Sequence, residues 1–241
     1  MKNALVTGGS RGIGKAISLA LAQQGCYVLI NYRSNHAEAE KVLDEIKENG
    51  GSAELLPFDV SSSSQVNEIL GGWMQKNEKY IDILVNNAGI TADNLMVFMS
   101  DDEWNKVINT NQNSFFYVTR EVLEGMVVSK FGRIINVVSL SGQKGHPGQV
   151  NYSASKGAIM AATKSLSMEV GKKKITVNCV APGFIKTDMT EQIDEKSWKK
   201  MIPLNRFGEA KEVASVVSFL ASDGASYITG ETIAVNGGMY S

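Results

Sequence analysis

The sequence is poor in cysteine. Its only two cysteines, Cys26 and Cys179, are too few for a disulfide framework in 241 residues, and neither belongs to a Cys-x-x-Cys pattern that would bind a metal. Both lie in apolar runs, so we expect them to be buried free thiols. The sequence therefore predicts neither a disulfide-stapled domain nor a metal site.

The sequence also lacks long apolar runs and an excess of charge of either sign. No stretch reaches the ~18 apolar residues of a membrane helix, and the apolar run after Met1 is shorter than a signal-peptide core. The 24 basic and 25 acidic side chains give a net charge of -1, which argues against a dedicated nucleic-acid-binding protein. We therefore expect a soluble cytoplasmic protein that binds neither membranes nor nucleic acid.

What the sequence does contain is enough apolar material for a large core. Hydrophobic residues make up 43% of the chain and charged residues 20%, which excludes intrinsic disorder. Single α/β domains often extend to about 250 residues, and we find neither an internal repeat nor a low-complexity linker. We therefore expect one domain over residues 1–241.

Short apolar runs alternate with helical segments along the chain. We expect strands at 4–6, 27–32, 53–57, 81–85, 133–138, 175–180 and 232–236, and helices at 13–24, 37–49, 62–76, 102–130, 152–172 and 209–222. Several strands are apolar throughout, as strands buried on both faces are, so helices must cover both sides of the sheet. This predicts an α/β fold with a single Rossmann-like, doubly wound parallel sheet of about seven strands.

One segment, residues 183–208, breaks this alternation. It contains Pro203 and no clear strand. Irregular segments of this length in compact domains are usually functional, so we expect a lid over the substrate.

A glycine-rich turn follows the first expected strand and opens the first expected helix. Residues 7–14 read Thr-Gly-Gly-Ser-Arg-Gly-Ile-Gly. Glycines let the backbone approach a phosphate closely, and a helix N-terminus offers free N–H groups and the positive end of its dipole. In this strand–turn–helix setting the turn indicates a phosphate site for a dinucleotide.

Two other motifs overlap the same turn, and each lacks a required part. A P-loop needs a serine or threonine for Mg²⁺ where this chain has Ala16. A hydrolase nucleophile elbow needs an earlier strand–helix loop and a histidine, but the only histidines are His36 and His146, each in a loop-like stretch. We therefore favour the dinucleotide site.

The residues about 20 positions after Gly12 select between two dinucleotides. An acid there would bind the ribose 2′-hydroxyl of NAD. The chain has Tyr32 followed by Arg33, and Arg11 adds a second cation inside the turn. Because guanidinium groups pair well with a phosphate, the sequence favours NADP over NAD.

A tyrosine and a lysine share one face of an expected helix. Tyr152 and Lys156 are four residues apart, a spacing that is common by chance. Ser139 and Asn87, however, each follow an apolar strand, and Asn111 lies in the helical stretch between them. The carboxyl ends of the strands are where open α/β sheets bind ligands, so these residues form a candidate active site.

Together these residues resemble the short-chain dehydrogenase/reductase family, from the glycine turn to Asn236-Gly237-Gly238. The segments 86–90, 181–189 and 228–240 most closely resemble the bacterial members that reduce 3-oxoacyl groups on acyl carrier protein. The resemblance implies an NADPH-dependent oxidoreductase of fatty acid or related acyl-chain synthesis, and a homotetramer.

The resemblance also assigns roles to individual residues. It implies that the catalytic residues are Asn111, Ser139, Tyr152 and Lys156. It implies that NADP(H) contacts Gly8, Ser10, Arg11, Gly12, Ile13, Gly14, Tyr32, Arg33, Asp59, Val60, Asn87, Ala88, Gly89, Tyr152, Lys156, Pro182, Gly183, Ile185 and Thr187. Among these, Asp59 and Val60 match the pair that lies against the adenine, Asn87 the residue beneath the adenosine ribose, and Ile185 and Thr187 the stretch that holds the nicotinamide amide and pyrophosphate.

The implied partner is acyl carrier protein, which is strongly acidic. The resemblance matches Lys130 and Lys173 to the basic residues that dock it, and we expect such cations, with Arg133 beside them, near the cleft. Two alternatives stay open: a reductase of another ketone, such as acetoacetyl-CoA, a sugar or a steroid, and a non-catalytic binding protein of the same fold. Gln112 and the loop residue His146 depart from the family pattern, so the accepted acyl group is not fixed by the sequence.

Overall fold

Seven parallel strands form the centre of the structure, a computed structural model that describes residues 1–240; Ser241 lies outside the described residues. The strands run in the order β3-β2-β1-β4-β5-β6-β9. Their bounds are Asn3–Val6 (β1), Tyr27–Tyr32 (β2), Ser52–Pro57 (β3), Ile83–Asn86 (β4), Gly132–Val137 (β5), Ile175–Pro182 (β6) and Thr232–Val235 (β9). The expected doubly wound parallel sheet is thus confirmed.

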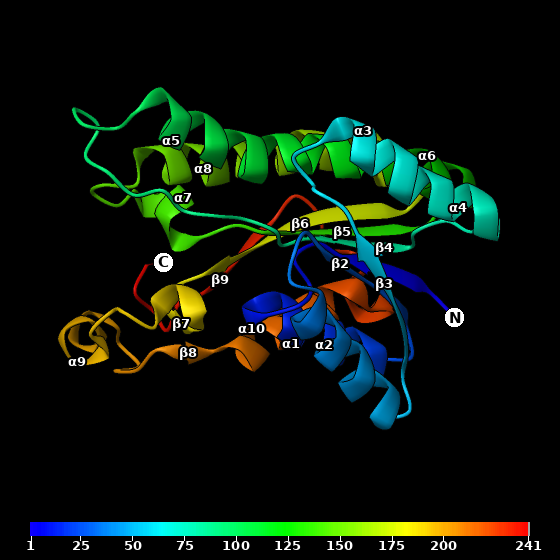
Figure 1. Ribbon diagram of the computed structural model, residues 1–241, viewed down its shortest axis with the longest axis horizontal. Helices are drawn as coiled ribbons and strands as arrows, with labels where there is room; N and C mark the ends of the chain where they lie inside the picture. Colours follow the sequence, from blue (N-terminus) through cyan, green and yellow to red (C-terminus); the bar gives the residue numbers. More distant parts are fainter. Residues whose placement is uncertain (241) are drawn as a thin grey trace.

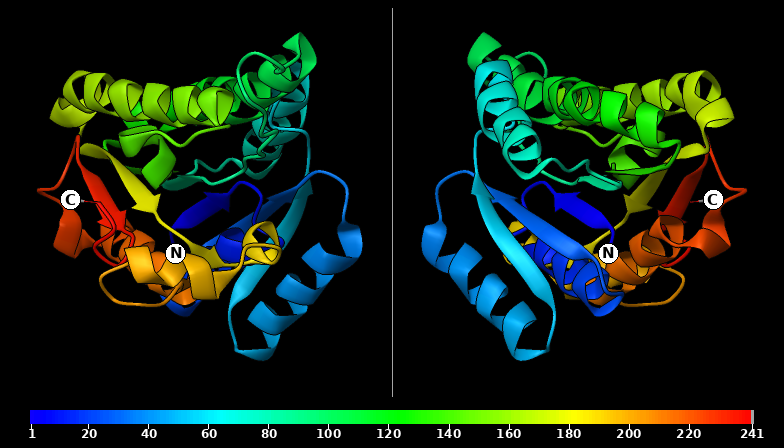
Figure 2. Two further views of the ribbon diagram at one scale, coloured as in Figure 1. Left: turned by 90° about the vertical axis from the view of Figure 1, so that its left-hand side faces the viewer. Right: turned by 90° about the vertical axis from the view of Figure 1, so that its right-hand side faces the viewer.

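Helices cover both faces of this sheet (Figures 1 and 2). One layer contains α1 (Gly12–Gln23), α2 (His36–Glu48) and α10 (Ala210–Ala221). The other contains α3 (Ser63–Gln65), α4 (Gly72–Asn77), α5 (Asp101–Val107), α6 (Ser114–Ser129) and α8 (Val150–Val170). The strand order reverses between β1 and β4, which creates the crevice where such sheets bind ligands.

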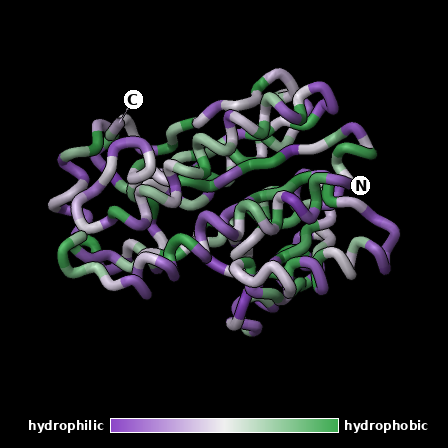
Figure 3. Tube along the Cα trace, turned by 90° about the horizontal axis from the view of Figure 1, so that it is seen from above, coloured by the Kyte–Doolittle hydropathy of each residue, from purple (hydrophilic) through white to green (hydrophobic). Residues whose placement is uncertain are grey.

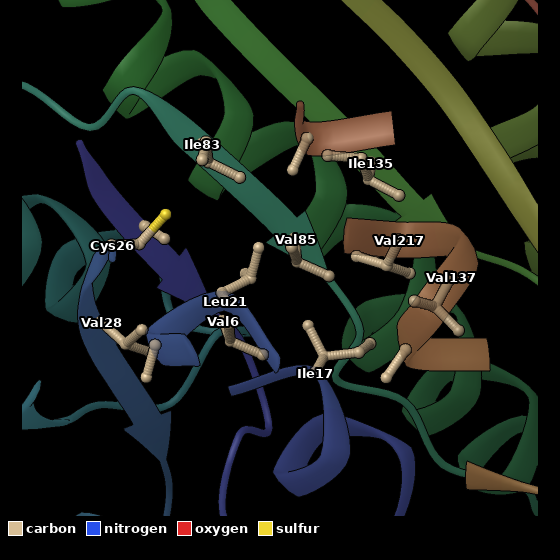
Figure 4. Packing of buried hydrophobic residues seen from close by; sticks show 14 of the residues in the cluster. Val6, Ile17, Leu21, Cys26, Val28, Ile83, Val85, Ile135, Val137 and Val217 are labelled. Carbon is tan, nitrogen blue, oxygen red and sulfur yellow. The ribbon is translucent and has the colours of Figure 1, made fainter. Parts of the chain in front are cut away.

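The core lies between the sheet and each helix layer. In the α1/α10 layer, Ile17 and Leu21 pack against Val6 and Val85 of the central strands, with Val217 from α10 (Figure 4). A second cluster fills the opposite face under α6. Figure 3 shows hydrophobic residues concentrated along the inner segments and hydrophilic ones at the outer turns. Both cysteines are buried and free, as expected.

Two expected helices are interrupted by π-helical turns. The stretch expected at 62–76 is α3, a π-helical segment Val66–Gly71 and α4, and it begins at the N-cap Ser62. The stretch expected at 102–130 is α5, a π-helical segment Ile108–Asn113 and α6. Apolar periodicity does not distinguish these turns from α-helix, yet such bulges often mark functional sites; the second one contains Asn111.

The segment 183–208 is more regular than the sequence suggests. It contains β7 (Ile185–Lys186), which pairs in parallel with β8 (Gly208–Glu209), and α9 (Glu195–Trp198). Short 3₁₀ turns lie at Asp188–Thr190 and Lys199–Met201. The expectation of no strand there is therefore wrong, because two-residue strands carry no readable alternation. The helix α7 (Leu140–Lys144) and the 3₁₀ turn Asp223–Ala225 lie outside the expected elements, and the helix expected at 152–172 ends in a 3₁₀ turn, Gly171–Lys173.

Two kinds of feature are absent from residues 1–240. None of the helices there is long and apolar enough to cross a membrane. No group of three or more His, Cys, Asp or Glu side chains in that range is placed to hold a metal ion.

Candidate active site

A cleft of about 710 Å³ opens at the carboxyl ends of the central strands. Every residue that the sequence assigns to the cofactor lines it, from Gly8 to Thr187, and so does Ser139. Asn111, Gln112 and His146 do not line it. The further lining residues, which sequence reasoning missed, are Asn31, Ser34, Asn35, Phe58, Ile90, Thr91, Thr110, Val137, Val138, Asp188, Met189 and Thr190.

The glycine turn forms a cradle in which a side chain at Gly14 would have no room. Gly8 and Gly12 have φ of +61° and +52°, values that favour glycine. A Cβ on Gly14 would lie 2.1 Å from the Gly8 carbonyl oxygen, so the start of α1 packs directly against the turn. Backbone N–H groups at the helix start are therefore accessible to an anion, as a pyrophosphate site requires.

Side chains from neighbouring strands hold this turn in place. The Thr7 hydroxyl accepts hydrogen bonds from the backbone N–H groups of Asn87, at 2.9 Å, and Ala88, at 3.0 Å. The Asn87 amide in turn donates to the carbonyl oxygens of Thr7, at 2.9 Å, and Gly8, at 3.2 Å. The loops after β1 and β4, some 80 residues apart in the chain, are thus locked together.

Asn31, which the sequence analysis missed, braces the turn from the other side. Its amide oxygen accepts from the Gly8 N–H at 3.2 Å, and its nitrogen donates to the carbonyls of Leu56 and Phe58 at 3.2 and 3.0 Å. A polar residue directly after the apolar run 28–30 was the available signal. A buried amide is stable only when its groups are paired, and these three bonds pair it.

One end of the cleft carries an exposed cation. The Arg33 side chain is 63% exposed, and its guanidinium lies 3.8 Å from the Asp59 carboxylate. Ser34 and Asn35 extend the lining at the start of α2, where the Asn35 side chain accepts from the Glu38 N–H. At this end of the cleft, the Arg33 guanidinium and the polar side chains of Ser34 and Asn35 could bind a phosphate monoester, and the Asp59 carboxylate lies beside the guanidinium.

The other end of the cleft contains the tyrosine and the lysine. Both come from the first turns of α8, and the Lys156 Nζ lies 5.6 Å from the centroid of the Tyr152 ring. The lysine side chain is buried, at 4% exposure, and its Nζ donates to the Val137 carbonyl oxygen at 2.9 Å. Ser139, two residues beyond that carbonyl, caps α7 and faces the phenol.

Burial shifts the acidities of both groups. Loss of hydration lowers the pKa of Lys156 to about 8, because burial penalises its charged form. The same effect raises the pKa of Tyr152 to about 12, against which a hydrogen bond with the Ser139 side chain acts. The phenol is therefore a proton donor at neutral pH, next to an ammonium that titrates close to neutrality.

Asn111 lies behind the cleft. Its amide oxygen accepts from the Ile90 N–H at 2.9 Å, and its nitrogen donates to the Ile90 carbonyl at 3.0 Å and to the Ser155 hydroxyl at 3.1 Å. A Cβ on Gly89 would lie 3.3 Å from both the Asn111 oxygen and the Lys156 Nζ. Asn111 thus ties the loop after β4 to α8 at the level of the lysine.

Lys130 and Lys173 are not at the cleft of their own chain. Lys130 ends α6 just before β5, and Lys173 lies just before β6. Because the strands are parallel, residues that precede them lie at the sheet edge opposite the cleft, so the expectation of nearby docking cations is wrong for a single chain. Arg133 is buried, and it donates to the carbonyls of Gly132 and Lys174.

Comparisons with known proteins agree with this geometry. A family model described as enoyl-(acyl carrier protein) reductase matches residues 8–240. The 3-oxoacyl-[acyl-carrier-protein] reductase FabG of Pseudomonas aeruginosa is 50% identical, over 99% of this chain and 97% of that protein. The 3-oxoacyl-[acyl-carrier-protein] reductase of Synechocystis sp. is 46% identical, over 98% and 96%.

A solved structure is similar throughout. A crystal structure assigned to a gluconate dehydrogenase of Agrobacterium tumefaciens has a TM-score of 0.95 and 32% sequence identity, and covers 99% of this chain and 95% of that one.

Replacing Gly14 by alanine tests the cradle. We expect Gly14→Ala to weaken dinucleotide binding at least tenfold, and to lower the free energy of unfolding by about 1–3 kcal/mol, because its Cβ would collide with backbone. Fluorescence titration with NADPH and thermal melting measure the two effects. Gly72→Ala is the matched control, because Gly72 lies in a helix and has open space around it. This substitution should raise the free energy of unfolding by about 0.5–1 kcal/mol and leave NADPH binding unchanged. Equal binding by the two variants would contradict the cradle.

Proposed function

The chain belongs to the short-chain dehydrogenase/reductase family, and from this premise we propose that it reduces 3-oxoacyl groups on acyl carrier protein to 3-hydroxyacyl groups with NADPH. The observation that carries the proposal is the grouping of Ser139, Tyr152 and Lys156 at one end of a dinucleotide-sized cleft. Near full-length identity of 44–50% to several 3-oxoacyl-carrier-protein reductases supports the substrate class. The pathway would be fatty acid or related acyl-chain synthesis.

The cleft residues fit the proposed cofactor. The glycine cradle and the start of α1 would hold the pyrophosphate, Arg33 the 2′-phosphate, and Asp59 with Val60 the adenine. Asn87 would support the ribose, while Ile185 and Thr187 would hold the nicotinamide amide. When bound there, NADPH would supply the hydride for the ketone carbon.

The chain's own groups would supply the proton and stabilise the developing charge. Tyr152 would donate its phenolic proton to the ketone oxygen. The ammonium of Lys156, held by the Val137 carbonyl, would stabilise the phenolate that remains. Ser139 would donate a hydrogen bond to the oxygen as negative charge develops.

Asn111 would act by positioning. Its bonds to Ile90 and Ser155 fix the loop after β4 relative to α8, and so fix Gly89 against Lys156. We further propose that it supports the water that, in the family it resembles, links the lysine to solvent.

A second copy of the chain would bring Lys130 and Lys173 close to a cleft, namely the cleft of its neighbour. The exposed side of α6 carries a row of residues spaced four apart: Phe116, Arg120, Glu124 and Val128. Phe116 is 52% exposed and Val128 is 62% exposed. In a twofold antiparallel pair, Phe116 would meet Val128 of the second copy, and Arg120 would meet Glu124.

This pairing would also bring each cleft to the other copy's lysines. It sets Lys130 opposite residue 114 of the second copy, at the sheet edge where the second copy's cleft opens. Lys130 and Lys173 would then dock the carrier protein for the neighbouring active site. A second contact at the exposed edge strand β9, beside the fully exposed Tyr227, would complete a cytoplasmic homotetramer.

Turnover on matched substrates tests the proposed function. The enzyme should oxidise NADPH with a 3-oxoacyl group on carrier protein faster than with gluconate-type or steroid ketones. Tyr152→Phe should lower that rate by about 10²–10⁴-fold, because a positioned general acid is lost. Tyr80→Phe is the matched control and should leave the rate unchanged, because Tyr80 is exposed and does not line the cleft. Near wild-type turnover by the Tyr152→Phe variant would refute the catalytic assignment, and faster turnover of the free ketones would refute the carrier-linked substrate.

Arg33 tests the choice of cofactor. We expect Arg33→Asp to weaken NADPH binding by about 10–100-fold, since a charged hydrogen-bond partner becomes a repelling charge, while NADH binding stays equal or improves. Isothermal titration of both cofactors measures this. Lys47→Asp, at the far end of α2, controls for net charge. A wild-type protein that binds both cofactors equally would show that Arg33 does not select NADPH.

A charge exchange on α6 tests the assembly. Arg120→Glu and Glu124→Arg should each weaken association by about tenfold or more, because like charges would meet across the twofold axis. The double exchange should restore it. Sedimentation velocity reports the assembly. If the double variant dissociates as readily as the single ones, or the wild-type protein is monomeric, the pairing is wrong.

The same pairing predicts complementation between copies. A chain with Tyr152→Phe and a chain with Lys130→Glu and Lys173→Glu should each be poorly active on carrier-linked substrate. Mixed assemblies should regain activity, because one copy would provide the tyrosine and the other the lysines. No gain on mixing would leave the lysines without a docking role.

A further inference from the structure

The segment 183–208 is a preassembled unit. Its two ends are joined by the β7–β8 pairing, and Lys186 lies 3.7 Å from the Glu195 carboxylate and 3.8 Å from that of Glu209. The Glu195 side chain also accepts a hydrogen bond from the Phe207 N–H at 3.1 Å. The segment is therefore braced internally as one unit.

Aromatic side chains give this unit a small core. The rings of Phe184 and Phe207 stack with centroids 5.1 Å apart and an interplanar angle of 14°. Trp198 of α9 lies against Phe184, also at 5.1 Å. Phe207 is buried. One end of the unit also shapes the cleft, because Thr187, Met189 and Thr190 line it.

One aromatic contact leads out of the unit. The ring of His146 lies 5.7 Å from that of Trp198, at 40°. His146 belongs to the loop between α7 and α8, and so stands between Ser139 and Tyr152 in the chain. This contact joins the unit to the segment that carries both catalytic side chains.

The loop holds His146 in a defined position. Its Nδ1 lies 2.9 Å from the Pro147 carbonyl, to which it donates, and its own carbonyl accepts from the Gln149 N–H at 3.0 Å. Gly145 and Gly148 flank the turn with φ of +77° and +81°, and the Asn94 N–H donates to the Gly148 carbonyl. The ring is thus presented on a braced turn rather than on a free loop.

We propose that His146 is a positioning residue that docks the segment 183–208 onto the catalytic loop by packing against Trp198. Docking fixes the wall formed by Thr187, Met189 and Thr190 relative to Ser139 and Tyr152. Because Met189 and Thr190 of that wall would border the bound acyl group, the contact sets how firmly substrate is held; this last step rests on the proposed function. The docking itself concerns only the chain's own residues.

Hydrogen exchange on the full-length protein tests the docking directly. We expect His146→Ala to accelerate amide exchange in residues 188–201 by about 2–10-fold, the range that one aromatic pair contributes. His146→Phe keeps a ring and should restore the slow exchange. Exchange in α10 should be unchanged in both variants.

A double-mutant cycle makes the test specific to this pair. Trp198→Leu should accelerate exchange at least as much as His146→Ala, because it also loses the contact with Phe184. The double variant should be no faster than Trp198→Leu alone. Additive effects would overturn the proposal, as would unchanged exchange in His146→Ala or fast exchange in His146→Phe.

Kinetics then separate docking from the proposed function. In His146→Ala, the KM for a carrier-linked 3-oxoacyl substrate should rise about 2–10-fold while kcat stays within about twofold, and His146→Phe should reverse the rise. A drop in kcat without a change in KM would contradict a role in holding substrate. If wild-type enzyme does not turn over that substrate while the exchange results hold, the proposed function fails and the docking stands.

Discussion

A buried ammonium is the constraint on which the site depends. The Lys156 side chain is buried where it lines the cleft, and a charge there is stable only beside a polar partner. That partner is the carbonyl of Val137, the last residue of β5, which lies one residue beyond the last pair that β5 makes with β4. The same strand end delivers Ser139 two residues later, and α8 delivers Tyr152 one turn from the lysine. The end of one strand and the start of one helix thus fix all three groups.

At the other end of the cleft, the glycine turn is likewise held by groups from neighbouring strands. Its backbone carries the free N–H groups, so its shape has to be imposed from outside. Thr7, Asn31 and Asn87 impose it through bonds between three neighbouring strands. The glycine turn and Tyr152 therefore share one rigid sheet edge. Our proposal leaves specificity to parts beyond that edge, namely Arg33 and the segment 183–208.

Sequence patterns predicted the sheet, the cleft and many of its lining residues, because continuous apolar strands and glycine spacing follow directly from burial and backbone geometry. They missed Asn31, whose role depends on carbonyls of β3 and the loop beyond. They missed the π-helical turn at Asn111, because six residues are too few for an apolar pattern to distinguish a π-helical turn from α-helix. They also placed Lys130 and Lys173 near the cleft, although both residues precede their strands and so lie at the opposite end of the sheet. Closeness to a strand in the sequence does not show at which end of that strand a residue lies. Contacts such as His146 with Trp198 join segments about 50 residues apart, and no local pattern encodes them.

The most direct test of this account is the titration of Lys156 itself. Nuclear magnetic resonance of ¹³Cε-labelled lysine, with Lys156→Arg to assign the signal, reports its pKa in the folded protein. The account predicts a pKa of about 8, well below the ~10.4 of exposed lysines, since burial favours the neutral amine. Because the pKa of Lys156 is lower in the folded than in the unfolded chain, its charge lowers the free energy of unfolding below about pH 8. That loss is relieved as the pH rises from about 8 toward ~10.4, the pKa of lysine in the unfolded chain. A Lys156 signal that titrates with the exposed lysines would contradict a buried cation beside Tyr152.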